Sequence, residues 1–147
     1  MARADFRYSF PFRVRYSEID GQGVVFNAHY LTYFDTAITE YLRAMNFDYE
    51  EHVKATGEDV HTVKTLVEYK APVRFDEEID VHVRAARVGR TSLILLLEVH
   101  AKDQDELRAT GEVVWVNTNQ TTHVPAPWTG NFVEMLKDFE GDNLEIA

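Results

Sequence analysis

Cysteine is absent from the 147 residues of this chain. Its absence excludes disulfides, a catalytic thiolate and any metal site built on cysteine, and it removes one guide to the cellular compartment. The chain also lacks an apolar run of the roughly 20 residues that a membrane-spanning helix needs. The first ten residues carry charges but no apolar segment typical of secretory signals, so we expect a cytoplasmic protein with no membrane span.

Positive charge is scarce. Lys and Arg total 15 against 25 Asp and Glu, which gives a formal net charge of −10. A field of that sign repels the phosphate backbone, so we expect no nucleic-acid partner. An anionic small molecule would need a local group of cations, and Arg84, Arg87 and Arg90 form one around the turn at Val88 and Gly89.

Histidine spacing gives no sign of a metal site. None of the six histidines shows a His-x-x-x-His or comparable metal-ligand spacing. They are His29, His52, His61, His82, His100 and His123. We therefore predict a protein without bound metal.

Apolar residues are plentiful, at 45% of the chain with nine Phe and seven Tyr, which is enough for one core in a single domain over residues 1–147. The clearest pattern is a helical stripe with apolar residues three and four positions apart. It consists of Tyr30, Tyr33, Phe34, Ala37, Ile38, Tyr41, Leu42 and Met45. This stripe predicts a long helix that starts between Asn27 and His29 and ends near Met45, with Asn27 as a candidate N-cap.

The remaining segments predict mostly strands. Alternating or continuous apolar residues predict strands at 6–16, 61–69, 78–88, 91–102 and 106–117. Pro11 places the first of them at a sheet edge, because proline donates no ladder hydrogen bond. Short helices are expected at 47–57, between Asp48 as cap and Gly57 as stop, and at 131–139. We expect the acidic tail, 140–147, to be frayed.

This order of elements predicts an α+β fold, in which an antiparallel sheet of about five strands wraps around one long central helix. The run from Leu93 to Leu97 is apolar on both sides, as in a strand covered on both faces. A single long helix cannot cover both faces of the sheet. We therefore expect a partner subunit, most simply in a twofold dimer.

The stretch YSEIDGQGVVFNAHY, from Tyr16 to Tyr30, resembles the signature of hotdog-fold acyl-CoA thioesterases of the 4-hydroxybenzoyl-CoA thioesterase type. That signature reads aromatic-x-x-x-Asp-x-x-Gly-hydrophobic-hydrophobic-x-x-x-x-Tyr and runs straight into a helix. Residues 88–92 are similar to the family's turn into its fourth strand. Residues 109–116, followed by Pro125, are similar to its last strand and closing loop.

The resemblance implies a hotdog fold, a dimer or tetramer, and hydrolysis of an acyl-CoA thioester without a cofactor. It implies that Asp20 acts as nucleophile or general base, and that a backbone N–H at the helix start near Asn27 holds the thioester carbonyl. Substrate contacts are expected from Gly23, Val24 and Tyr30, and contacts to the nucleotide of coenzyme A from Arg87 and Arg90.

This chemistry is reasonable for the residues present. A thioester is already activated, and a helix start offers free N–H donors and partial positive charge to a developing oxyanion. Many relatives carry histidine where this chain has Asn27, so Asn27 is either a cap alone or a cap that also contacts the reacting groups. We take His29 as a first-turn residue rather than a catalyst. Glu18, Asp35 and Glu40 are candidate second carboxylates, which we expect instead on a solvated face or in ion pairs.

Two other functions remain open. A hotdog dehydratase or hydratase pairs a histidine with an acid at a different place, and a noncatalytic acyl-thioester-binding module would not need Asp20. An acyl carrier protein is acidic and would be repelled by a surface of charge −10, so coenzyme A is the favoured carrier. The sequence leaves the acyl group open.

Overall fold

The structure is a computed structural model in which residues 5–147 are described. The first four residues, part of the segment in which we expect no secretory signal, lie outside that range. The chain divides into two compact units. The first comprises the residues up to Tyr41, Leu66–Arg84 and Leu97–Gly111, and the second comprises Leu42–Thr65, Ala85–Leu96 and Glu112–Ala147.

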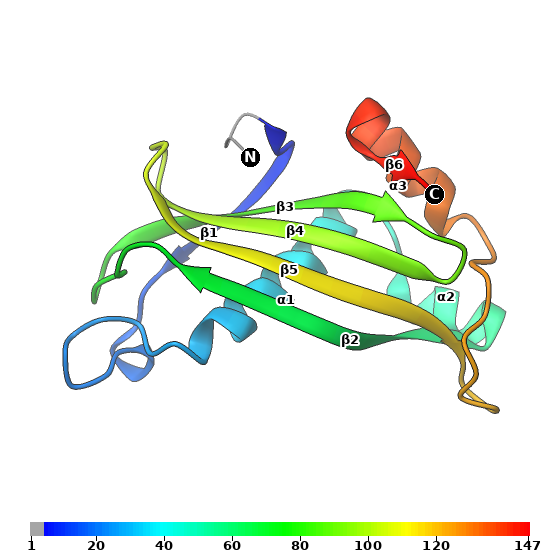
Figure 1. The fold of residues 1–147 in the computed structure, drawn as a ribbon, viewed down its shortest axis with the longest axis horizontal. Helices are drawn as coiled ribbons and strands as arrows, with labels where there is room; N and C mark the ends of the chain where they lie inside the picture. Colours follow the sequence, from blue (N-terminus) through cyan, green and yellow to red (C-terminus); the bar gives the residue numbers. More distant parts are fainter. Residues whose placement is uncertain (1–4) are drawn as a thin grey trace. The chain divides into compact units, whose positions relative to one another are not determined.

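Figure 1 shows the elements in chain order. The strands are β1 (Tyr8–Arg13), β2 (Glu58–Tyr69), β3 (Glu78–Val88), β4 (Ser92–Ala101), β5 (Leu107–Asn119) and β6 (Glu145–Ile146). The α-helices are α1 (His29–Ala44), α2 (Tyr49–Thr56) and α3 (Phe132–Glu140), with short 3-10 turns η2 (Tyr16–Glu18) and η3 (Gly141–Asn143). The strand order is β1-β3-β4-β5-β2, and β6 pairs with β3. The predicted α+β class with an antiparallel sheet of about five strands is confirmed.

In the first unit, β1 pairs antiparallel with β3, from Tyr8 opposite Val83 to Arg13 opposite Glu78. Because β1 ends the strand order, Pro11 lies at a sheet edge as predicted. The predicted continuation of this strand to Tyr16 is wrong. The N–H of Glu18 donates to the carbonyl of Arg15, which turns the backbone and leaves Tyr16 77% exposed.

The apolar stripe of α1 is buried as its spacing predicted. In the first unit, its buried members are Tyr30, Tyr33, Phe34, Ala37, Ile38 and Tyr41. The helix packs so closely on β5 that a Cβ added to Gly111 would lie 2.3 Å from the ring of Phe34. Only glycine therefore fits at this position of β5 without displacing the buried Phe34 ring.

In the second unit, the predicted short helices are confirmed. The Asp48 carboxylate caps α2 by accepting the N–H of Glu51 at 3.0 Å, and Gly57 ends the helix with a φ of 69°. The expectation that 140–147 is frayed is wrong, because Leu144 is only 7% exposed and β6 pairs with Arg87 and Val88. The pairing of β1 with β3 ends at Val83, so the backbone groups of the last residues of β3 remain available to pair with the tail.

None of the helices within residues 5–147 combines the length and apolar character needed to cross a membrane. In the same residues, no group of three or more His, Asp or Glu side chains is arranged to hold a metal ion.

Candidate active site

Asp20 lies at the tip of a tight loop in the first unit. The two legs of the loop meet in an antiparallel bridge between Ile19 and Val25. The N–H of Asp20 donates to the carbonyl of Val24 at 2.9 Å, and the N–H of Gly23 donates back to the carbonyl of Asp20 at 3.0 Å. Gly23 has a φ of 76°, in the left-handed region that glycine enters without a steric penalty. The glycine of the signature is thus required by the turn itself.

The carboxylate of Asp20 belongs to a half-buried residue, and one of its two oxygens is hydrogen-bonded. Its Oδ1 accepts the N–H of Gln22 at 2.8 Å, the bond typical of an aspartate that shapes its own turn. None of the hydrogen bonds described for residues 5–147 uses the other oxygen, Oδ2. Asp20 therefore forms the turn and also retains an acceptor oxygen for another group.

A neighbouring segment, residues 73–75, braces this loop. The N–H of Val25 donates to the carbonyl of buried Val73 at 2.8 Å, and Val24 bridges Arg74. The N–H of Phe75 donates to the carbonyl of Gly23 at 3.2 Å. These bonds fix the backbone at Gly23 and Val24, the two positions at which we expect substrate contacts.

Arg108 bonds to residues on both sides of this bracing segment, Pro72 and Glu77. Its guanidinium, in a residue only 9% exposed, donates to the carbonyl of Pro72 at 2.8 Å and pairs with the Glu77 carboxylate at 2.5 Å. Burial alone would raise the pKa of Glu77, but hydrogen bonds from Arg108 and from the N–H of Arg74 hold that pKa below its usual value. A charged pair thus stabilises the turn on which the Asp20 loop rests.

The returning leg of the loop leads directly into α1. The N–H groups of His29 and Tyr30 donate to the carbonyls of Phe26 and Asn27, at 3.0 and 3.4 Å. The N–H groups of Asn27 and Ala28, both exposed residues, take part in no hydrogen bond described within residues 5–147. Over the same residues, no backbone N–H donates to the Asn27 side chain, so the expected N-cap contact is not formed.

Three tyrosines lie beside this helix start. The hydroxyl of Tyr69, at the end of β2, donates to the carbonyl of Asn27 at 3.0 Å. The ring of Tyr69 stands edge-on to Tyr30, with ring centroids 5.1 Å apart. Burial, with smaller contributions from Tyr69 and Glu77, raises the pKa of Tyr30, so its phenol stays protonated. Nothing in the sequence around Tyr69 indicated its contact with Asn27.

The third tyrosine, Tyr33, bonds to Glu18. Its hydroxyl donates to Glu18 Oε1 at 2.8 Å, and the N–H of Arg15 donates to the same oxygen at 2.8 Å. Burial and then the bond to Glu18 raise the pKa of Tyr33 far above its ordinary value. The expectation that Glu18 is a solvated or ion-paired acid is therefore wrong. Asp35 is exposed, as expected.

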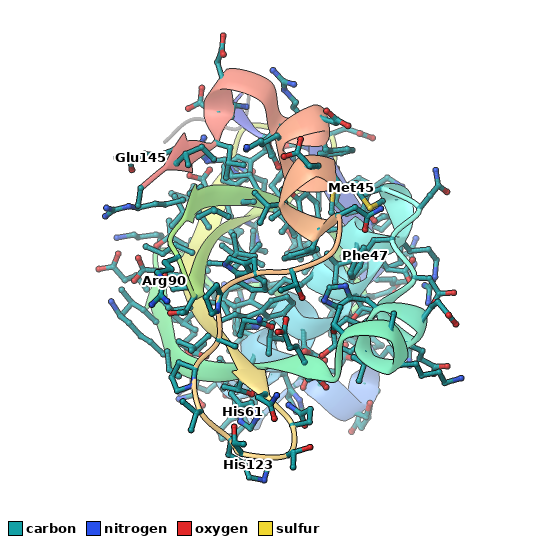
Figure 2. The ribbon with its side chains drawn as sticks, turned by 90° about the vertical axis from the view of Figure 1, so that its right-hand side faces the viewer. Met45, Phe47, His61, Arg90, His123 and Glu145 are labelled. Atoms are coloured by element: carbon teal, nitrogen blue, oxygen red, sulfur yellow. The ribbon has the colours of Figure 1, made fainter. Side chains whose placement is uncertain are left out.

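The arginines expected to contact a nucleotide do not share a unit with Asp20. Arg87 and Arg90 belong to the second unit, whereas Arg84 belongs to the first. The Nε of Arg87 lies 3.8 Å from Glu145 Oε2 on the surface. Arg90 is exposed and lines a groove of about 410 Å³ together with Trp128 and Glu134. Figure 2 labels Arg90 on the same side of the view as Glu145.

Comparisons with known proteins identify the family of this chain. The model of a family described as the thioesterase superfamily matches residues 22–108, more than half of the chain, beginning just after Asp20. The acyl-CoA thioesterase YbgC of Haemophilus influenzae is 30% identical over 121 residues, which cover 82% of this chain and 88% of that protein.

Solved structures show the same fold. A 1,4-dihydroxy-2-naphthoyl-CoA thioesterase from Synechocystis superposes with a TM-score of 0.82 at 15% identity, covering 89% of this chain and 96% of that one. The protein SAV2348 from Staphylococcus aureus, solved in complex with CoA, superposes with a TM-score of 0.83 at 17% identity, covering 93% of this chain and 85% of that one. The family match and the YbgC relative establish that the chain, whose fold these structures share, belongs to the thioesterase superfamily of hotdog-fold proteins and is a thioester hydrolase.

Proposed function

We propose that this protein hydrolyses acyl-CoA thioesters to a free acid and coenzyme A. The observation that carries the proposal is the pairing of two features in one loop. Asp20 keeps an uncommitted carboxylate oxygen, and the same loop leads into a helix start at which the N–H groups of Asn27 and Ala28 are uncommitted. The YbgC relative, named as an acyl-CoA thioesterase, and the CoA complex of a structural neighbour support coenzyme A as the carrier.

Asp20 can act in either of two ways. As a nucleophile, its carboxylate oxygen attacks the thioester carbonyl, the C–S bond breaks, the thiolate of coenzyme A leaves, and water hydrolyses the resulting anhydride. As a general base, Asp20 takes a proton from water, the hydroxide adds to the carbonyl, and the tetrahedral intermediate expels the thiolate, which is then protonated. A thiolate leaves readily, so neither route needs a Ser-His-Asp triad.

The helix start supplies the second half of the chemistry. We propose that the N–H groups of Asn27 and Ala28 receive the oxyanion that forms on the thioester carbonyl, aided by the positive end of the α1 dipole. One such donor lowers the barrier by roughly 3–4 kcal/mol in enzymes where it has been removed. The exposed Asn27 amide is the nearest side chain to these donors along the chain, and we keep it as a candidate contact to the reacting groups.

The remaining substrate contacts are proposals of the same kind. Gly23 and Val24 offer a fixed backbone surface beside Asp20, and Tyr30 with Tyr69 forms an aromatic wall next to Asn27. Arg90 is proposed to contact the nucleotide, because it is exposed and lines an open groove that Trp128 also lines. Arg87 is the weaker candidate, because Glu145 lies close to it.

We also propose that one domain spans the chain, that the sheet wraps around α1, and that the protein is at least a homodimer and possibly a tetramer, in the cytoplasm. The edge strand β2 supports association, since Val63, Leu66 and Tyr69 are 60%, 44% and 52% exposed on it. On β4, Ile94 and Leu96 are only half-buried in a single chain. Light scattering should give a mass at least twice 17.0 kDa, whereas a monomeric mass would contradict the association.

The direct test is thiol release from a panel of short-chain, long-chain and aromatic acyl-CoAs. At least one of them should be hydrolysed with saturable kinetics, and the best substrate will define the acyl class. A folded protein that binds coenzyme A but releases thiol from none of the panel would support the noncatalytic module instead. Hydration of an enoyl-CoA without thiol release would support the dehydratase class.

A further inference from the structure

Glu18 connects three parts of the first unit. It lies two residues before Asp20, at the base of the loop. Its Oε1 accepts the hydroxyl of Tyr33 from α1 and the N–H of Arg15 from the outgoing leg, each at 2.8 Å. Its backbone carbonyl accepts the N–H of Phe26 from the returning leg at 2.9 Å. One residue thus bonds to both legs of the loop and to the helix into which the loop leads.

We propose that Glu18 and Tyr33 are positioning residues that hold Asp20 at a fixed place relative to the start of α1. The proposal rests on the proposed function, because it concerns the separation between the carboxylate and the oxyanion donors. The turn itself is closed by backbone bonds, at the bridge between Ile19 and Val25 and between Phe26 and the Glu18 carbonyl, and does not need the Glu18 side chain. What Glu18 adds is a bond from the turn to the helix.

Tyr33 is a rigid anchor for this bond. The residue is only 2% exposed, and its ring packs against Phe12 with centroids 5.0 Å apart and against Tyr30 at 6.1 Å. Burial raises the pKa of its phenol, so the hydroxyl remains a donor throughout the neutral range. Since α1 begins at His29, the anchor lies about one turn inside the helix, close to the proposed oxyanion donors.

The choice of residue type supports this role. A phenylalanine at position 33 would fill the core as well as the tyrosine ring does, and a buried tyrosine hydroxyl must find a partner. The partner is a carboxylate in the loop rather than a group in the core. A displacement of about 1 Å between reacting groups can lower a rate by about a hundredfold, so this bond can affect catalysis without touching the substrate.

The test separates positioning from simple stabilisation through three variants. Tyr33→Phe removes only the hydroxyl and should lower kcat about tenfold, with KM changed by less than about twofold and Tm nearly unchanged. Glu18→Ala should lower kcat at least as much. Glu18→Gln keeps an oxygen that can accept both bonds, so it should stay within about threefold of the parent protein. The Glu18→Ala, Tyr33→Phe double variant should be no slower than the slower single variant.

Thr110→Val is the matched control. It removes another hydroxyl-to-carboxylate hydrogen bond in the same unit, from Thr110 to Glu68 at 3.3 Å, and should leave kcat unchanged. An unchanged kcat in Tyr33→Phe, or additive losses in the double variant, would overturn the proposal. If Tyr33→Phe does not fold, the Glu18→Ala and Glu18→Gln pair decides the question, because Glu18 lies in a half-buried turn rather than in the core.

Hydrogen exchange gives a readout that does not depend on activity. In Glu18→Ala, the amides of Asp20 and Phe26 should exchange at least about tenfold faster, while those of β3 and β4 keep their protection. If the parent protein releases thiol, Asp20→Asn does not, and Tyr33→Phe is unaffected, the positioning proposal is refuted and the proposed function stands. No thiol release by the parent protein would refute the proposed function, and unchanged exchange at Asp20 and Phe26 would still refute positioning.

Discussion

Two carboxylates in this chain, Asp20 and Glu58, differ in burial and in hydrogen-bond partners. Asp20, in the first unit, is half-buried and gives one oxygen to the N–H of Gln22. Glu58, in the second unit, is only 8% exposed, and its Oε1 accepts the Asn117 amide at 2.9 Å and the Thr129 hydroxyl at 2.8 Å. Asn117 in turn donates to the carbonyls before α3, at Ala126 and Pro127. Glu58 therefore ties together β2, β5 and the segment leading to α3.

The two acids differ in the number of segments that bond to them. Both acids adjoin a glycine, Gly57 before Glu58 and Gly21 after Asp20, so both read as turn residues in the sequence. Side chains from two other segments, the buried Asn117 and the exposed Thr129, bond to Glu58, whereas only its own turn bonds to Asp20. A carboxylate that is bonded from several segments stabilises the fold. A carboxylate that keeps an oxygen, in a loop that leads into a helix, fits the catalytic role that we propose for Asp20.

The largest expected effect is on catalysis. Asp20→Asn removes the charge and the nucleophilic oxygen but keeps an amide oxygen that can still accept the N–H of Gln22. We expect kcat for the best acyl-CoA to fall at least about a thousandfold, equivalent to about 4 kcal/mol of barrier. Urea unfolding should show a free energy of unfolding within about 0.5 kcal/mol of the parent protein. A variant that keeps full thiol release would remove Asp20 from the mechanism.

Glu58→Ala should show the converse pattern. It removes the carboxylate that accepts the buried Asn117 amide and the Thr129 hydroxyl, which should lower the free energy of unfolding by about 1–3 kcal/mol, mostly through Asn117 because Thr129 is exposed. The kcat of the folded fraction should stay within about twofold of the parent value. Asp138→Ala, at an exposed position of α3, is the control and should change stability by less than about 0.5 kcal/mol. A large loss of kcat in the folded Glu58→Ala protein would contradict a purely structural role for Glu58.

The sequence predicted the parts of the fold that depend on local pattern. The spacing of α1 identified its buried face because residues three and four apart share one side of a helix. The cap at Asp48 and the stop at Gly57 were likewise local signals. The tail was mispredicted because its order depends on where the pairing of β1 with β3 ends. That position is a property of the sheet, and the composition of the tail does not contain it.

The candidate site divides in the same way. The signature located Asp20, Gly23 and the helix start because they lie within one short stretch. The contacts that shape the site join distant residues, such as Tyr69 to Asn27, 42 positions apart, and Tyr33 to Glu18, 15 apart. No periodicity relates such positions. The side chain of Glu18 was expected on a solvated face or in an ion pair for this reason, since the sequence of a loop does not show which distant tyrosine will bond to its acid.

The smallest expected effect concerns binding in the second unit. Arg90→Ala should raise KM for acyl-CoA about three- to tenfold and change kcat by less than about twofold, because a surface guanidinium contributes about 1 kcal/mol to a phosphate contact made equally in the ground and transition states. Arg87→Ala is the matched control, and its effect on KM should be smaller because Glu145 already lies near Arg87. Added salt should raise KM more in the parent protein than in Arg90→Ala, since salt screens exposed charges. An unchanged KM would exclude Arg90 as a nucleotide contact. A lower kcat with an unchanged KM would mean that Arg90 affects the chemical step, which would contradict the assignment of that step to the Asp20 loop alone.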